Sequence, residues 1–234
     1  MRRLRAFLFL LLLPWQAAAQ EGLPVDLELV LAVDASGSVD NDELRLQLSG
    51  IAVAFRSPEV LKAVAEGPYG RIAVALVLWA GHNNPKAISS WVLVHDEVTA
   101  EHFAAMVERF PRGGIDGATG IGKAIAFSAR ALTGNGYDGE RLVVDISGDG
   151  RENPPDDWTV MLNDSRAFAS SRGVSVNGLA ILTEDPTLDT YYRYHVILGA
   201  GAFVEVAATY ADFAEAIHRK LIREIAAPLV VGSR

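Results

Sequence analysis

The sequence of 234 residues contains no cysteine, and this absence excludes two kinds of structure. A chain without thiols forms no disulfide framework and no metal site built from thiolates. Its stability must therefore come from a hydrophobic core. Half of the residues are hydrophobic, so we expect one large folded domain rather than a disordered chain.

Histidine is also scarce, and the few histidines show no metal-binding pattern. No two of the five have the close helical spacing of a zinc motif. We interpret them as surface residues or as satisfied core residues: His82, His95, His102, His195 and His218.

No hydrophobic run is long enough to span a membrane. The run Ala6–Leu13 is far shorter than the ~20 residues that a transmembrane helix needs. Three arginines precede it, and Ala17–Ala19 supplies a small-residue cleavage pattern, which together are typical of a secretory signal peptide. An uncleaved membrane anchor is the alternative, and the shortness of the run disfavours it.

We therefore predict a signal peptide over residues 1–19, with cleavage between Ala19 and Gln20 and a periplasmic or secreted product. No cysteine follows the cleavage site, which excludes attachment through a lipidated cysteine. We assign residues 25–226 to one domain and residues 227–234 to a C-terminal tail. No membrane insertion is expected after cleavage.

Positive charge is in the minority, with 21 Lys and Arg against 29 Asp and Glu. Cleavage of the signal peptide removes three arginines and moves the formal net charge from −8 to −11. An acidic surface repels phosphate backbones, so nucleic acid is not an expected partner. The same surface suits cation binding.

Strand-like and helix-like segments alternate along the chain. The predicted strands are residues 27–33, 72–79, 87–94, 141–146, 174–182 and 202–206. The predicted helices are residues 40–55, 99–110, 121–132, 156–171, 188–197 and 210–225. Loops or turns are predicted at Pro58 and over residues 67–70, 81–85, 111–120 and 134–139.

This alternation predicts an α/β fold. The sheet is expected to be doubly wound, mainly parallel and six-stranded, with helices on both faces. Polar residues interrupt strand 87–94, so we expect that strand at an edge.

The first predicted strand leads into Asp34-Ala-Ser-Gly-Ser38. Asp34, Ser36 and Ser38 alternate with small residues and so direct several oxygens toward one spot, as a hard cation requires. A capped turn is the simpler interpretation, because Asp and Ser are frequent in caps and turns. Capping does not call for three oxygens at alternate positions, so we favour a set of metal ligands.

Two further segments place oxygens at the ends of predicted elements. Thr119 lies in a glycine-rich loop before a helix, and Asp149 lies in Gly148-Asp-Gly150 after the fourth strand. In a doubly wound sheet, ligands bind beyond the carboxyl ends of the strands. The combined set has two carboxylates and three hydroxyls, which favours Mg²⁺, then Mn²⁺, over Zn²⁺. A helix cap at Thr119 and a plain turn at Asp149 are the simpler alternatives.

In these segments the sequence resembles the von Willebrand factor A domain family. Asp34-Ala-Ser-Gly-Ser38 matches its D-x-S-x-S signature, Thr119 its single threonine, and Asp149 its aspartate before a glycine. The resemblance covers roughly residues 25–226 and is greatest to an exported bacterial branch. It implies a Rossmann-like fold with one antiparallel edge strand. Gly148 departs from the commoner Thr-Asp-Gly pattern of the family.

The resemblance implies a metal-ion-dependent adhesion site in a protein-binding module, not an enzyme. Ser36, Ser38 and Thr119 would supply hydroxyl oxygens. Asp34 and Asp149 would bind the ion directly or through water. One coordination position would stay open for a carboxylate of a partner protein.

Four further acidic or amide residues near these segments are not predicted to be metal ligands. Asp145 interrupts an apolar strand, so we expect it to be buried and paired. Asp116 is expected to face solvent. Glu152 and Asn153 are expected at the rim of the site at most.

Two other functions stay open at this level. A metal-dependent hydrolase or phosphatase can also begin with an aspartate after a strand, but Ser36 stands where the second acid is needed, and Lys123 lies inside a predicted helix. Neither Ser36 nor Ser38 has the glycine two residues before it that a nucleophile elbow requires. A scaffold domain with a vestigial metal site is the other alternative, and the complete set of five ligands disfavours it.

Overall fold

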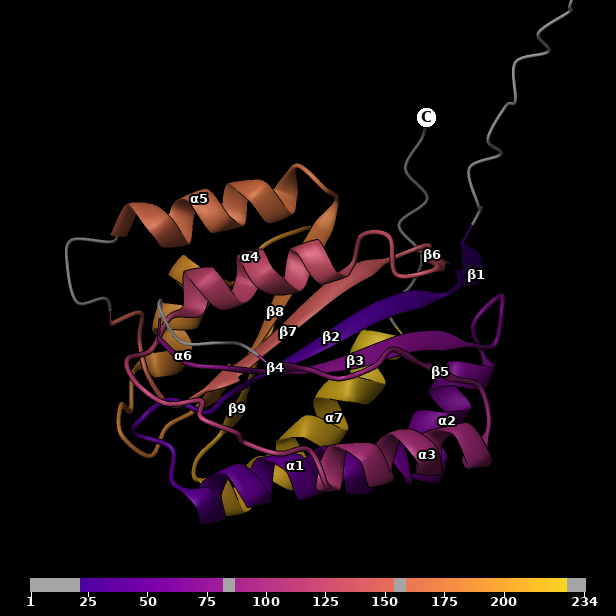
Figure 1. Ribbon diagram of the computed structural model, residues 1–234, viewed down its shortest axis with the longest axis horizontal. Helices are drawn as coiled ribbons and strands as arrows, with labels where there is room; N and C mark the ends of the chain where they lie inside the picture. Colours follow the sequence, from indigo (N-terminus) through magenta and orange to yellow (C-terminus); the bar gives the residue numbers. More distant parts are fainter. Residues whose placement is uncertain (1–21, 82–86, 154–158, 227–234) are drawn as a thin grey trace, which may run out of the picture.

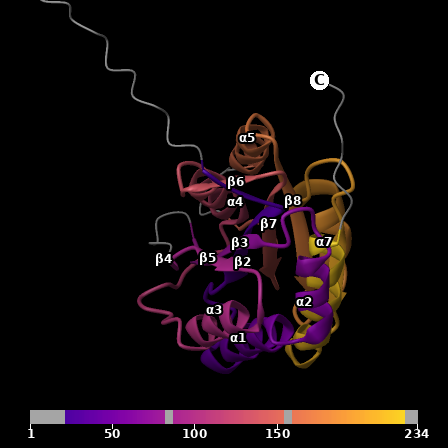
Figure 2. The same ribbon diagram turned by 90° about the vertical axis from the view of Figure 1, so that its right-hand side faces the viewer.

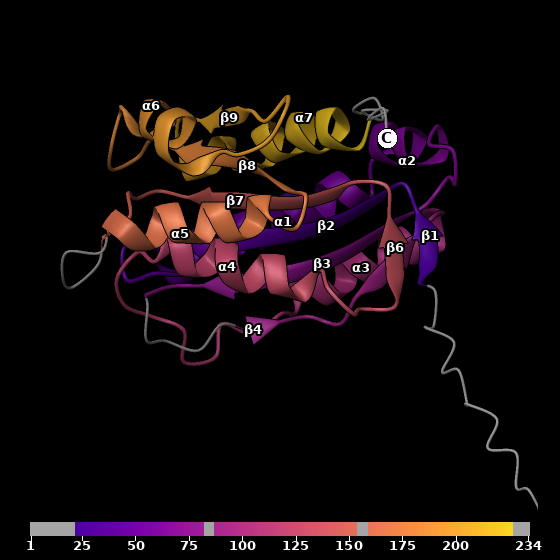
Figure 3. The ribbon, with the colours of Figure 1, turned by 90° about the horizontal axis from the view of Figure 1, so that it is seen from above.

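The computed structural model describes residues 22–81, 87–153 and 159–226. Within these ranges, the main sheet consists of β2 (Leu27–Asp34), β3 (Ile72–Trp79), β4 (Ala87–Ile88), β5 (Val92–Val94), β7 (Leu142–Gly148), β8 (Val174–Ile181) and β9 (Val204–Ala207). Their order in space is β4-β3-β2-β7-β8-β9, with β5 also paired to β3. Figure 3 shows this succession across the sheet.

Helices cover both faces of the sheet. They are α1 (Asn41–Phe55), α2 (Pro58–Ala65), α3 (Glu97–Glu108), α4 (Ile121–Ala131), α5 (Thr159–Ser170), α6 (Leu188–Tyr191) and α7 (Phe213–Ile225), with a π-helical turn η1 (Tyr192–Val196) and a 3-10 turn η2 (Tyr210–Asp212). Figures 1 and 2 show α4 and α5 on one face and α1, α2, α3 and α7 on the other.

The predicted α/β fold is confirmed, because β3, β2, β7, β8 and β9 pair in parallel between two helical layers. The predicted strand 87–94 forms two short strands, β4 and β5, both antiparallel to β3 at the edge. Ser89 lies between them, and its Oγ accepts a hydrogen bond from the Leu76 N–H at 2.9 Å. Since one predicted strand is divided, the main sheet has seven strands rather than six.

Two short elements differ from the sequence prediction. Pro58 begins α2 rather than a loop, because proline suits the first helical position and Ser57 Oγ caps the helix by accepting from the Val60 N–H at 3.2 Å. Part of the predicted turn 134–139 forms β6 (Tyr137–Gly139), which pairs in parallel with β1 (Leu23–Val25). Strands of three residues are too short to show a period.

Several predictions fall outside the described residues. These are the signal peptide over residues 1–19, most of the turn at 81–85, the start of the helix at 156–171, and the tail at 227–234. Among the helices that are described, none combines the length and the apolar character needed to cross a membrane.

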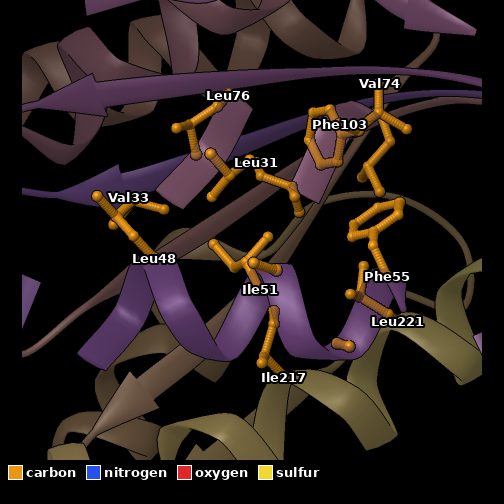
Figure 4. Close-up of a cluster of buried hydrophobic side chains, with 14 of the residues drawn as sticks. Leu31, Val33, Leu48, Ile51, Phe55, Val74, Leu76, Phe103, Ile217 and Leu221 are labelled. Atoms are coloured by element: carbon orange, nitrogen blue, oxygen red, sulfur yellow. The ribbon is translucent and has the colours of Figure 1, made fainter. Parts of the chain in front are cut away.

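Hydrophobic side chains fill the space between the sheet and the helices below it (Figure 4). Leu31 and Val33 of β2 meet Leu48, Ile51 and Phe55 of α1 there. The α1 residues recur at three- and four-residue spacing, so one stripe of the helix faces the core. Every residue of β2 and β3 is buried, as is typical of central parallel strands. The carboxyl ends of these strands are therefore held in place by a fully packed core.

Asp145 of β7 is buried and paired, as predicted. Lys220 Nζ of α7 lies 2.8 Å from Asp145 Oδ2 and 3.0 Å from Glu224 Oε1, and all three side chains are buried. Asn177 Nδ2 of β8 donates a hydrogen bond to Glu224 Oε1 at 2.6 Å. This polar network attaches α7 to the centre of the sheet.

Candidate metal centre

The three predicted ligand segments meet at one edge of the sheet. β2 and β7 are adjacent and parallel, with Val33 paired to Ser147, so Asp34 and Asp149 occupy neighbouring strand ends. The loop that carries Thr119 leads into α4 at the same edge. In Figure 1, β2 and β7 point toward the left-hand side, where α4 also begins.

Direct contacts connect the side chains of the first and third segments. Ser38 Oγ donates a hydrogen bond to Asp149 Oδ1 at 2.9 Å, and Ser36 Oγ lies 3.2 Å from Ser38 Oγ. Asp34 Oδ1 accepts a hydrogen bond from the Ser36 N–H at 2.8 Å. The last contact is an Asx-type turn, which uses only one of the two Asp34 oxygens.

Thr119 reaches the same place from the second segment. A Cβ added at Gly150 would lie 3.2 Å from Thr119 Oγ1, so the missing side chain permits the close approach. The N-cap of α4 is Gly120, which has no side chain to cap the helix, and Glu152 rather than Thr119 accepts from an N–H of its first turn. The Thr119 hydroxyl is therefore not used as a helix cap.

Backbone hydrogen bonds join the three segments to one another. The Gly37 N–H donates to Gly117 O at 2.8 Å, and the Asn153 N–H donates to Thr119 O at 2.9 Å. These bonds hold the three loops against one another without any contribution from the proposed ligand side chains. The arrangement of oxygens is therefore preformed.

A pocket of about 400 Å³ opens over these residues. Its lining residues are Ser38, Thr119, Asp149, Gly150, Arg151, Glu152, Asn153 and Glu184. Asp34 and Ser36 are 0% and 1% exposed and do not line it. A ligand in this pocket would meet Ser38, Thr119 and Asp149 first, with Asp34 buried behind them.

Asp34 is the most perturbed acid of the site. Burial raises its pKa to about 7, and the nearby charge of Asp149 acts in the same direction. Within the described part of the chain, Asp34 Oδ2 forms no hydrogen bond. A buried carboxylate that lacks a partner is costly, and a cation is a partner that removes this cost.

The phenol of Tyr210 lies close to Asp149, the second acid of the site. Burial and the charges of Asp149 and Asp34 raise the pKa of Tyr210, so its phenol stays protonated beside the site.

Asp116 is exposed, as predicted, and its Oδ1 accepts from the Gly117 N–H at 2.7 Å.

The donor set fits a hard cation. In the described ranges, no three His, Cys, Asp or Glu side chains gather into a metal site. The candidate site consists instead of two carboxylates and three hydroxyls, and oxygen ligands of this kind suit Mg²⁺ and Mn²⁺. These five side chains would hold the ion, and the ion would supply a positive charge at the floor of the pocket.

Sequence reasoning missed several residues that support the site. Arg112 Nη2 donates to Ala35 O and to Ser36 O, each at 3.1 Å. Gln47 Nε2 donates to Asp34 O at 3.2 Å and is fully buried. The signal for Gln47 was present, since it is a polar residue within the apolar stripe of α1, whereas Arg112 gave none.

The rim of the pocket is also charged. Arg151 Nε donates to Asp185 Oδ2 and Arg151 Nη2 to Thr187 Oγ1, both at 2.7 Å. Glu152 Oε2 accepts from the Gly122 N–H at 2.9 Å, in the first turn of α4. Glu152 and Asn153 both line the pocket, in agreement with the expectation that they lie no closer to the site than its rim.

Comparison with protein families gives one match. The model of the family DUF1194, described as a protein of unknown function, matches residues 24–229. A search of curated proteins found no match.

Solved structures show the same fold at low sequence identity. Proximal thread matrix protein 1 from the mussel byssus is 13% identical, with a TM-score of 0.61 over 89% of this chain and 50% of that chain. The pilus adhesin SpaC from Lactobacillus rhamnosus GG is 15% identical, with a TM-score of 0.61 over 88% and 31%. The minor pilin PilB from Streptococcus sanguinis is 13% identical, with a TM-score of 0.59 over 92% and 65%.

The present chain thus spans about half of the mussel protein and about a third of the adhesin. A further structure of the mussel protein, 15% identical with a TM-score of 0.55 over 88% and 49%, has a zinc-occupied MIDAS motif, a metal-ion-dependent adhesion site. The likeness establishes that the fold is of the von Willebrand factor A type.

Proposed function

The chain belongs to DUF1194, a family described as of unknown function, and we propose that it is an exported protein-binding module. It would use a divalent cation to capture an acidic group of a partner protein. The observation that carries this proposal is the convergence of two carboxylates and three hydroxyls beneath an open pocket.

Each ligand has a proposed role. Ser36, Ser38 and Thr119 supply hydroxyl oxygens to the ion, while Asp34 and Asp149 bind it directly or through water. Mg²⁺ is the first choice and Mn²⁺ the second, because both prefer oxygen. The zinc found in the mussel protein makes Zn²⁺ a necessary comparison in any titration. One coordination position stays open for a carboxylate oxygen.

The charge of the pocket supports dependence on a cation. Asp149, Glu152 and Glu184 outnumber Arg151 among the charged lining residues. An acidic group would therefore be repelled from the empty pocket, since like charges repel strongly where solvent screening is incomplete. A bound divalent cation offsets this negative charge and places a positive centre on the floor of the pocket, so partner capture should require it.

The location and domain limits are part of the proposal. A signal peptide over residues 1–19 would direct the chain to the periplasm or beyond, leaving a domain over residues 25–226. The similar structures come from a byssus matrix protein, a pilus adhesin and a minor pilin, which agrees with an adhesive rather than an enzymatic role. No nucleic acid is proposed as a partner.

The open coordination position can be tested with Mn²⁺ as the bound ion. Water that stays on bound Mn²⁺ enhances the relaxation of bulk water protons. A short glutamate-rich peptide should displace this water from the loaded protein and lower the enhancement, while a lysine-rich peptide should not. An enhancement that the glutamate peptide leaves unchanged would overturn carboxylate capture.

The enzyme and scaffold alternatives make different predictions. A metal-dependent phosphatase would hydrolyse generic phosphate esters, and Asp34→Ala would abolish that turnover. A scaffold with a vestigial site would bind its partner equally well in a chelator. We expect no ester hydrolysis, and loss of partner binding when the cation is removed.

A further inference from the structure

Arg112 connects two of the three segments that carry proposed metal ligands. It lies in the loop between α3 and α4, which also carries Thr119. Its Nη2 donates hydrogen bonds to Ala35 O and to Ser36 O, each at 3.1 Å. Both carbonyls belong to the first ligand segment, residues 34–38. The side chain therefore reaches from the second ligand segment to the first.

The guanidinium group of Arg112 is held in place by two other bonds. Its Nε donates to Ile115 O of the same loop at 3.1 Å, and the Ile115 side chain is buried in the core. Its Nη1 donates to Asn41 Oδ1, at the start of α1, at 3.2 Å. A guanidinium is flat and presents its N–H groups in a fixed fork. These two bonds therefore set the direction in which Nη2 points.

The two carbonyls that Nη2 binds lie on either side of Ser36. The peptide unit before Ser36 contains Ala35 O and the Ser36 N–H, and the unit after it contains Ser36 O and the Gly37 N–H. The Ser36 N–H donates to Asp34 Oδ1 at 2.8 Å. The Gly37 N–H donates to Gly117 O at 2.8 Å. Because each peptide unit is planar, fixing both units fixes φ and ψ of Ser36, and with them the direction of its side chain.

The side chain of Ser36 depends on this backbone for its position. Ser36 is 1% exposed and lies in the buried part of the site. Its Oγ lies 3.2 Å from Ser38 Oγ, which is longer than the usual bond between two hydroxyls and holds the Oγ only weakly. The peptide units on either side, rather than this contact, therefore decide where the proposed ligand lies.

We propose that Arg112 is a positioning residue of the candidate metal centre: by binding both carbonyls beside Ser36, it directs the Ser36 hydroxyl toward the ion. Its contribution is geometric, because a positive charge near a cation site opposes cation binding. This inference rests on the proposed function, since it assumes that the centre binds a cation.

The test compares the affinity for Mn²⁺ of wild type and two Arg112 variants by calorimetry. Arg112→Met removes the fork and the charge. Loss of the charge alone would strengthen Mn²⁺ binding, whereas loss of a group that orients a ligand should weaken it about 10-fold. Arg112→Lys keeps the charge without the planar fork and should weaken binding as well. Arg109→Lys is the matched control, because Arg109 is an exposed residue of the same loop, and it should bind as wild type does.

A double-mutant cycle separates positioning of Ser36 from a general structural role. In the Ser36→Ala background, Arg112→Lys should cause little further loss of affinity, because the hydroxyl that Arg112 positions is already gone. In the Thr119→Val background, the losses should add, although Arg112 and Thr119 share a loop. A general loosening of the loop would affect both backgrounds alike. Urea unfolding in chelator establishes that each variant is folded before it is titrated.

The outcomes separate the inference from the proposed function. If wild type binds no divalent cation, both are overturned. If wild type binds Mn²⁺ and the Arg112 variants bind it within about twofold as tightly, or Arg112→Met binds it more tightly, only the inference is overturned. Additive losses for Arg112→Lys and Ser36→Ala would also overturn it, since they would show independent effects.

Discussion

Ser38 Oγ donates a hydrogen bond to Asp149 Oδ1 at 2.9 Å, although 111 residues separate the two in sequence. This contact joins the loop after β2 to the end of β7, and it links two proposed metal ligands directly. Because the backbone bonds of Gly37 and Asn153 already hold the loops together, the side chains need little rearrangement to meet an ion. A preformed site has a smaller entropic cost of binding.

Removal of the Asp149 charge should remove stabilisation by metal. An ion that binds only the folded state stabilises it by about 2.7 kcal/mol at a concentration 100 times its Kd. Wild type should therefore unfold at a higher temperature in Mn²⁺ than in chelator, and Asp149→Asn should show no such increment. Asp116→Asn, which alters an exposed acid of the neighbouring loop, should keep it. Equal increments in both variants would contradict the assignment of Asp149.

A methyl group at Gly150 should weaken metal binding through Thr119. The added Cβ would lie 3.2 Å from Thr119 Oγ1, so the hydroxyl must shift by a few tenths of an ångström. We expect Gly150→Ala to weaken Mn²⁺ binding about 10-fold. Gly114→Ala is the control, because its Cβ would meet no atom within 4 Å. Calorimetric titration compares the two, and equal affinities would argue against a ligand role for Thr119.

The pH dependence of stability should identify Asp34. Its pKa of about 7 in the fold exceeds its ordinary value of 3.8, so the metal-free fold binds this proton more tightly than the unfolded chain does. The stabilisation is complete below pH 3.8 and is lost as the pH rises through about 7.

Chemical unfolding of the metal-free protein from about pH 5 to about pH 8 measures the contribution of Asp34 to the free energy of unfolding. Asp34→Asn should lose less stability over that range than wild type. Burial also raises the pKa of Asp145 to about 7, but Asp145 is present in both proteins and its contribution cancels in the comparison. Identical pH profiles would contradict a perturbed Asp34.

The buried network under α7 should be essential for folding. Lys220→Met leaves Asp145 and Glu224 buried without their cation, and removal of one partner of a buried ion pair costs about 3–5 kcal/mol. Lys62→Met, in an exposed pair with Glu66, should change the free energy of unfolding by less than about 1 kcal/mol. Urea unfolding of both variants in chelator gives the comparison. A small cost for Lys220→Met would show that the network is dispensable.

Much of the fold was predictable because its central strands are apolar on both faces. Residues 72–79 form an uninterrupted apolar run, residues 27–33 form one that only Glu28 interrupts, and β3 and β2 follow these runs closely. The helix predicted over residues 40–55 begins in the structure with a capping box of Asp40 and Glu43, and both bonds of that box are present. Pro58 misled the prediction, because proline breaks helices in their interior but favours their first position.

The candidate ligands were predictable because each stands in a short motif at the end of a predicted strand or the start of a predicted helix. Asp34, Ser36 and Ser38 stand close together in the sequence, and their alternation carries information. Tyr192 carried none, because the place of its ring beside Gly178 and Gly148 depends on how β7, β8 and η1 pack against one another. Gly148 was a visible departure, yet only the structure explains why a glycine is needed there, since an added Cβ would lie 2.7 Å from Asp34 Oδ2 and 3.0 Å from Tyr192 Oη.

The central claim is that three loops form one site for a divalent cation. Calorimetric titration of Mn²⁺ into wild type, Ser38→Ala, Thr119→Val and Asp149→Asn tests it most directly, because each variant alters a different loop. We predict that wild type binds one ion and that each variant binds at least about 10-fold more weakly, while Ser49→Ala on the exposed side of α1 binds as wild type does. The account is contradicted if wild type binds no ion, or if the three variants bind it as tightly as wild type.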